Sequence, residues 1–100
     1  MSGPTSDTIP AETWRLGEGV RWRLWQDEAV VYNGRTGDTH HFADFAAWIF
    51  AQLAAGAATA TELDRATAAA VELNAGADRR DTIERTLGLL ARLELIERVA

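Results

Sequence analysis

The sequence contains no cysteine, and this absence excludes disulfide bonds, thiolate metal sites and cysteine nucleophiles. Its two serines, Ser2 and Ser6, lie near the amino terminus, so a Ser-His-Asp arrangement would require an ordered terminal segment. A glycine-rich phosphate loop is also missing, because the stretch from Gly34 to Gly37 has the character of a turn. We therefore expect a protein that is not an enzyme and that uses no cofactor.

Long hydrophobic runs are absent as well. The apolar runs are shorter than a membrane-spanning helix requires, and the amino terminus has no basic region followed by an apolar one. We expect a cytoplasmic protein with no membrane partner.

Lysine does not occur, and all ten basic residues are arginines in a chain of net charge −5. An acidic domain attracts nucleic acid poorly, because nonspecific affinity comes mostly from basic side chains that neutralise phosphates. The balance argues against nucleic acid as a partner, although a local basic cluster can override net charge.

The chain has 100 residues, of which 47% are hydrophobic and 25% charged, a composition typical of one folded domain. Residues 1–12 are polar and hold both prolines, which predicts a flexible tail before a domain at 13–100.

Strand patterns dominate the first half of this domain. Residues 20–25 alternate, with Val20, Trp22 and Leu24 on one face, and after a short polar break residues 29–33 form a second strand of a hairpin. This alternation places Trp22 in the core. We expect residues 14–16 to extend the same sheet.

A turn at residues 33–38 leads to a third strand at 39–42, and the pattern then changes to helical spacing. Asp44 suits the first turn of this helix and Gly56 its end. The apolar stripe of the first helix consists of Phe42, Phe45, Ala46, Ile49, Phe50 and Leu53.

Two further helices follow. Thr59 and Glu62 have the spacing of a capping box, residues 74–76 end the second helix, and Asp78 caps the third. The inner side of the second helix is predicted to hold Leu63, Ala66, Thr67 and Ala70, and that of the third Ile83, Thr86, Leu87, Leu90 and Leu93.

Residues 95–99 either form a short final strand or extend the third helix. The fold class is therefore α+β, a winged-helix-like arrangement in which a three-stranded antiparallel sheet precedes three helices.

The adjacent histidines His40 and His41 invite a metal-binding interpretation in which Asp38 is a further ligand. Adjacent strand residues point to opposite faces, so the two imidazoles cannot readily chelate one ion. A structural or peptide-contacting role fits the pair better, and we predict no metal site.

Arginines on the third helix allow a DNA-recognition interpretation in a winged-helix setting. They alternate with acidic residues, which favours a solvated face with pairs such as Asp81 and Arg85. The helix could instead contact an acidic peptide. Trp48 lies away from the centre of the first helix's stripe and either covers the core edge or enters a partner interface.

The third strand passes into the first helix with almost no loop, so it can lie at the edge of a small sheet with unpaired backbone groups facing outward. Such an edge can accept a peptide as an added strand, and edge strands also permit a homodimer. This organisation favours a binding module.

The sequence also resembles the PqqD-like peptide chaperones, or RiPP recognition elements, in the variant associated with an HPr-kinase-related protein. The resemblance covers residues 14–99, and its most specific part runs from 30 to 53, followed by the Thr59 cap. It is carried by Val-Val-Tyr-Asn at 30–33, Thr-Gly-Asp-Thr-His at 36–40 and Ala-Ala-Trp-Ile at 46–49. One departure is Ala43, where related sequences often carry serine.

The resemblance implies a module that binds the leader segment of a ribosomally made precursor peptide and presents it to a modifying enzyme or an HPr-kinase-related protein. It places the leader against the third strand and in a groove beside the third helix. The peptide-binding residues that this placement implies are Thr39, His40, His41, Phe42, Arg80, Ile83, Glu84 and Leu87. The alternative is a winged-helix DNA-binding protein or a purely structural interaction module.

Overall fold

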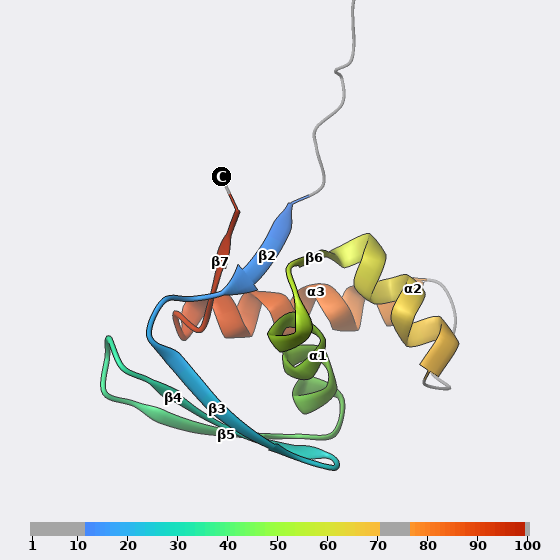
Figure 1. The fold of residues 1–100 in the computed structure, drawn as a ribbon. Coiled ribbons are helices and arrows are strands. Elements are labelled where there is room, and N and C mark those ends of the chain that lie inside the picture. Colours follow the sequence, from blue (N-terminus) through green and yellow to red (C-terminus); the bar gives the residue numbers. More distant parts are fainter. Residues whose placement is uncertain (1–11, 71–76, 100) are drawn as a thin grey trace, which may run out of the picture.

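The structure, a computed structural model, describes residues 12–70 and 77–99. The expected tail lies outside these residues except for Glu12, and so does the helix end predicted at residues 74–76. The elements are β2 (Thr13–Leu16), β3 (Val20–Trp25), β4 (Glu28–Asn33), β5 (Thr39–Ala43), α1 (Asp44–Ala55), β6 (Ala58–Thr59), α2 (Ala60–Ala70), α3 (Ala77–Arg92) and β7 (Ile96–Arg98). The α+β, winged-helix-like class is confirmed (Figure 1).

The predicted antiparallel sheet is present as β3-β4-β5, but β2 does not extend it. It lies in a second sheet of order β6-β2-β7. Gly17 donates its N–H to Leu95 O at 2.9 Å, and Gly19 has a φ of 82°, so the chain turns away before β3 begins. The prediction that residues 14–16 join the hairpin was therefore wrong.

The carboxyl terminus resolves the alternative left open by the sequence. Glu94 has a φ of 61°, a conformation that ends the helix, and β7 then pairs with β2 through Trp14–Arg98, Arg15–Glu97 and Leu16–Ile96. A short final strand is the correct interpretation.

The predicted core position of Trp22 is wrong, because its side chain is 40% exposed. It shares the inner face with the fully buried Val31, its neighbour on β4. However, α1 packs against β4 and β5, and β3 remains a largely uncovered edge.

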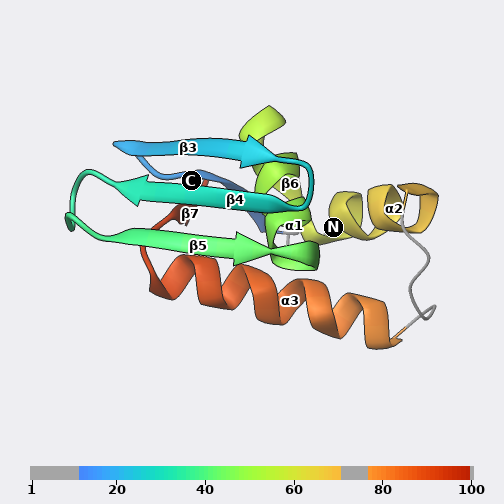
Figure 2. The ribbon, with the colours of Figure 1, turned by 90° about the horizontal axis from the view of Figure 1, so that it is seen from below.

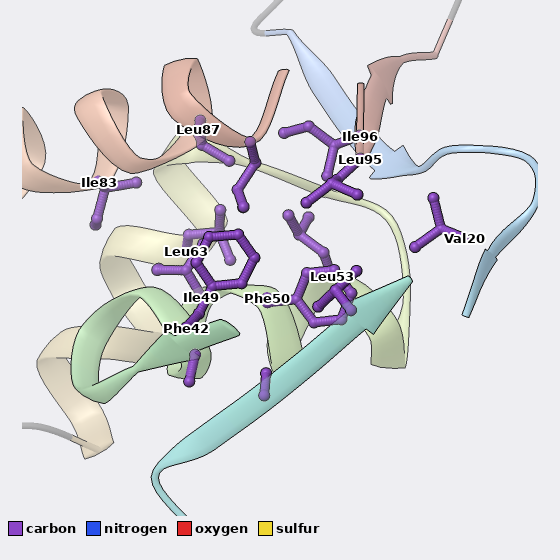
Figure 3. Packing of buried hydrophobic residues seen from close by; sticks show 14 residues of the cluster. Val20, Phe42, Ile49, Phe50, Leu53, Leu63, Ile83, Leu87, Leu95 and Ile96 are labelled. Atoms are coloured by element: carbon purple, nitrogen blue, oxygen red, sulfur yellow. The ribbon is translucent and has the colours of Figure 1, made fainter. Parts of the chain in front are cut away.

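The core gathers around α1, where Ile49 and Phe50 are fully buried and Gly56 ends the helix by donating to Leu53 O at 3.2 Å (Figure 3). The helix begins after Ala43 without a side-chain cap. Leu63 of α2 and Leu87 of α3 reach this core from two further elements.

Both remaining helices largely follow the sequence patterns. The capping box is formed, since Glu62 N–H donates to Thr59 Oγ1 at 3.0 Å and Thr59 N–H donates to Glu62 Oε1 at 2.8 Å. Ala70 is exposed, contrary to expectation, because α2 projects beyond the core there. The third helix begins at Ala77, so Asp78 lies within its first turn and is not its cap. No helix among the described residues is both long and apolar enough to cross a membrane.

Candidate functional site

β5 forms one edge of the sheet β3-β4-β5, and within the described part of the chain no strand pairs with its outer side. In Figure 2, α3 lies on the β5 side of this sheet and β3 on the opposite side. The predicted edge strand is therefore confirmed.

The hydrogen bonds that flank β4 and β5 set which backbone groups face outward. Asn33 N–H donates to Asp38 O at 2.9 Å and Asp44 N–H donates to Asp27 O at 2.8 Å. Antiparallel bonding alternates between these positions, so the backbone groups of His40 and Phe42 face β4. The outward backbone groups of β5 belong to Thr39, His41 and Ala43.

The two histidines lie on opposite faces, as the alternation predicted. His40 stands opposite the buried Val31 on the inner face and stacks on Phe42 with ring centroids 6.2 Å apart. Its Nε2 atom is buried and has no hydrogen-bond partner among the described residues. A ligand beside β5 could supply one.

His41 lies on the outer face, where its Nε2 atom is 3.0 Å from Glu28 Oε1. The pair therefore cannot close on one metal ion. Across the described ranges, no group of three or more His, Cys, Asp or Glu residues has an arrangement that could hold a metal.

The predicted residues of α3 lie elsewhere. Arg80, Glu84 and Leu87 line a pocket of about 420 Å³ on the side of the helix that faces β2 and the start of α2. Its other lining residues are Glu12, Trp14, Ala60 and Gly88, and no described residue of β5 is among them. The structure thus does not bring the two halves of the predicted site into one pocket.

Ile83, also predicted to contact peptide, is fully buried in the core. It belongs to the same inner stripe as Leu87 and Leu90, so its side chain stabilises the fold. The helical stripe that fills the core is thus the one that the sequence analysis assigned to the groove, and a role of Ile83 in peptide contact stays a prediction.

Helical spacing places Thr82, Thr86 and Leu89 on the flank of α3 opposite Glu84 and Gly88. This flank is the one turned away from the pocket beside β2 and the start of α2. Leu89 is 37% exposed there, a large apolar side chain outside the core. The sequence analysis missed Leu89 because it lies off the main stripe, although an apolar residue off the stripe is itself a usable signal.

No protein-family model matches the chain, and no curated protein matches it. Among solved structures, the chain is similar to TbiB1, described as in complex with the TbiA(beta) leader peptide. The TM-score is 0.69 and the identity 26%, over 86% of this chain and 98% of TbiB1. The likeness covers almost all of TbiB1, so the two chains share one fold from end to end of that protein.

Charges on α3 bear on the DNA-binding alternative. Arg80 pairs with Glu84 at 3.2 Å and Arg85 with Asp81 at 2.5 Å, as predicted for the second pair. Arg79 donates from Nε to Asp64 Oδ1 on α2 at 2.6 Å. Because these cations already face carboxylates, α3 offers little free positive charge for phosphates.

The Arg79 hydrogen bond lowers the pKa of Asp64, with burial opposing the shift. The same bond raises the pKa of Arg79. This pair therefore joins α2 to the first turns of α3 and stabilises the fold, since both partners are largely covered.

Proposed function

We propose that this chain is a RiPP recognition element that binds the leader segment of a ribosomally made precursor peptide without catalysing a reaction. The observation that carries the proposal is the open edge of β5 in a chain that shares its fold with TbiB1, a protein solved with a leader peptide. Presentation of the leader to a modifying enzyme, in the manner of PqqD-like chaperones, and a cytoplasmic setting are parts of the same proposal.

The alternation of inward and outward backbone groups along β5 determines how a leader would bind. Its backbone would form hydrogen bonds with the outward groups of Thr39, His41 and Ala43. Leader residues opposite His40 and Phe42 would then stand in the closer, non-hydrogen-bonded positions, with their side chains on the inner face. Apolar side chains suit these positions, because they would lie between β5 and the Leu89 flank of α3.

The buried Nε2 atom of His40 supports this arrangement. A buried polar atom without a partner costs about 1–3 kcal/mol. A hydroxyl or amide group on a leader residue beside His40 would remove that cost only when peptide is bound, and would therefore add specificity.

The test is a backbone NMR titration with synthetic leader from a precursor gene adjacent to this one. We expect the largest shifts at residues 38–43 and on α3 near Leu89. The variant His41→Pro removes an outward N–H and should weaken binding at least fivefold, since a lost hydrogen bond costs about 1 kcal/mol. The matched control His41→Ala removes only the side chain and should bind nearly as the parent does.

Four results would contradict the proposal. Shifts confined to α2 would place the ligand elsewhere, and equal binding by the proline and alanine variants would exclude strand addition. A response to duplex DNA that falls steeply with salt, with none to peptide, would favour the DNA-binding alternative. Shifts centred on Arg80, Glu84 and Gly88 would assign the leader to the pocket beside β2.

A further inference from the structure

The opposite edge of the same sheet is also open. β3 pairs with β4 along all six residues, and no described strand pairs with its other side. Such an edge normally carries devices that prevent pairing, such as charged side chains, proline, bulges or a covering element, and of these β3 has only the charges of Arg21 and Arg23. β3 has no proline, and five of its six residues are exposed.

Large apolar side chains are concentrated on this edge. Trp22, Leu24 and Trp25 are 40%, 43% and 52% exposed. Trp22 also contacts the fully buried Phe50 edge to face, with ring centroids 6.0 Å apart. The exposed surface is therefore continuous with the core, and a strand added here would extend the core over Trp22 and Leu24.

The same alternation along β3 determines which of its backbone groups could bind an added strand. Gly34 N–H donates to Gly19 O at 3.0 Å, so the alternation directs the backbone groups of Arg21 and Arg23 toward β4. The outward backbone groups belong to Val20, Trp22 and Leu24. Partner residues opposite Arg21 and Arg23 would thus occupy the closer cross-strand positions, where side chains interact most strongly.

The charges of Arg21 and Arg23 favour acidic residues in any strand that pairs with this edge. Both are exposed on the outer face, and neither forms an ion pair with any described residue. The acid nearest in register, Glu28, is already hydrogen-bonded to His41. The edge is therefore a local cationic, aromatic strip on a chain whose net charge is −5.

We propose that the β3 edge binds an extended segment of a second protein in which acidic and apolar residues alternate. The acidic residues would face Arg21 and Arg23, and the apolar residues would cover Trp22 and Leu24. Tryptophan and arginine are the side chains most enriched at protein interfaces, which fits this composition.

A second copy of this chain fits the edge less well. In symmetric antiparallel pairing centred on Trp22, Arg21 stands opposite the partner's Arg23, and pairing centred on Arg23 places that residue opposite itself. Like charges directly opposite each other are destabilising. An acidic strand from another protein is the occupant that the charges favour.

The proposal is independent of the leader site, because β4 and β5 separate the two edges. With leader on β5 and a partner strand on β3, one sheet would hold both, about 15–20 Å apart at strand spacings of about 4.8 Å. The fold would then hold a peptide and a segment of a second protein on the two edges of one sheet.

The test uses two synthetic peptides matched in length to β3, one alternating Glu and Val and one alternating Lys and Val. The ¹⁵N-labelled chain is titrated with each. We expect the Glu-Val peptide to shift the amides of β3 and the Lys-Val peptide to bind about tenfold more weakly. The double variant Arg21→Glu, Arg23→Glu should reverse this preference.

The matched control is Arg65→Glu with Arg92→Glu, which makes the same change in net charge at two exposed arginines that form no ion pair with a described residue. It should keep the preference of the parent. His41→Pro should also bind the Glu-Val peptide normally, so a failure at β3 and a failure of leader binding are distinguishable results.

Equal binding of both peptides, binding of neither, or shifts confined to β5 would overturn the proposal. The proposal would also be overturned if the chain self-associates with concentration, shifts its β3 amides in doing so, and loses this behaviour in Trp22→Lys. That result would assign the edge to a second copy.

Discussion

The side-chain amide of Asn33 on β4 donates to the backbone carbonyl of Glu94, at 3.0 Å, just beyond the end of α3. Asn33 is fully buried and also donates to Leu93 O at 3.3 Å, while its Oδ1 atom accepts from Arg35 N–H at 2.9 Å. One side chain therefore organises the turn before β5 and holds the end of α3 against the sheet.

Replacing Asn33 with alanine should destabilise the protein by about 3 kcal/mol, because two carbonyls and two turn N–H groups lose this partner in a buried site. Asn33→Asp keeps the acceptor and loses the donor, so it should be nearly as destabilising. Chemical denaturation measures both. A loss below about 1 kcal/mol for the two variants would show that α3 is held by packing alone.

Leu87→Asp should unfold the domain, because Leu87 is only 3% exposed and an unpaired charge in the core is costly. The matched variant Leu89→Asp changes the same residue type two positions along, on the exposed flank, and should leave the melting temperature nearly unchanged. It should weaken leader binding instead. Circular dichroism melts separate the two, and equal melting temperatures would mean that the inner stripe is misassigned.

The contribution of the Asp64–Arg79 pair to the stability of the fold should depend on pH. The pKa of Asp64 is lowered in the folded state, so its stabilisation is present above the usual value of about 3.9 and is lost as pH falls through the lowered pKa. Melting temperatures of the parent and of Asp64→Asn should differ at neutral pH and converge as the pH falls through the lowered pKa of Asp64. A constant difference across this range would show that the ionised form of Asp64 contributes nothing.

Gly88→Ala should stabilise the protein by about 1 kcal/mol, because alanine is the better helix former in a helix interior. A Cβ atom there would meet only Arg92 Nη1, at an ordinary 3.8 Å. The contrasting variant is Gly37→Ala, which has open space but a φ of 84°, and should be destabilising. Loss of peptide binding by Gly88→Ala without loss of stability would indicate that a ligand enters the pocket beside β2.

Structural features that depend on residue patterns within a few positions could be predicted from the sequence. Alternation in residues 20–25 determined the hairpin, the spacing of Thr59 and Glu62 determined the start of α2, and the spacing of Ile83, Leu87 and Leu90 determined the inner side of α3. Alternation also placed His40 and His41 on opposite faces. Each depends on backbone geometry within a few residues, which the sequence alone determines.

Only the tertiary structure decided which neighbour covers each face. The second sheet joins residues 13–16 to 58–59 and 96–98, and no local pattern encodes pairing between such distant segments. The same limit explains Trp22, whose alternation is that of a buried residue although α1 leaves β3 uncovered. It also explains the division of the α3 residues between core, pocket and outer flank, because periodicity defines a helix face and packing alone determines what lies against it.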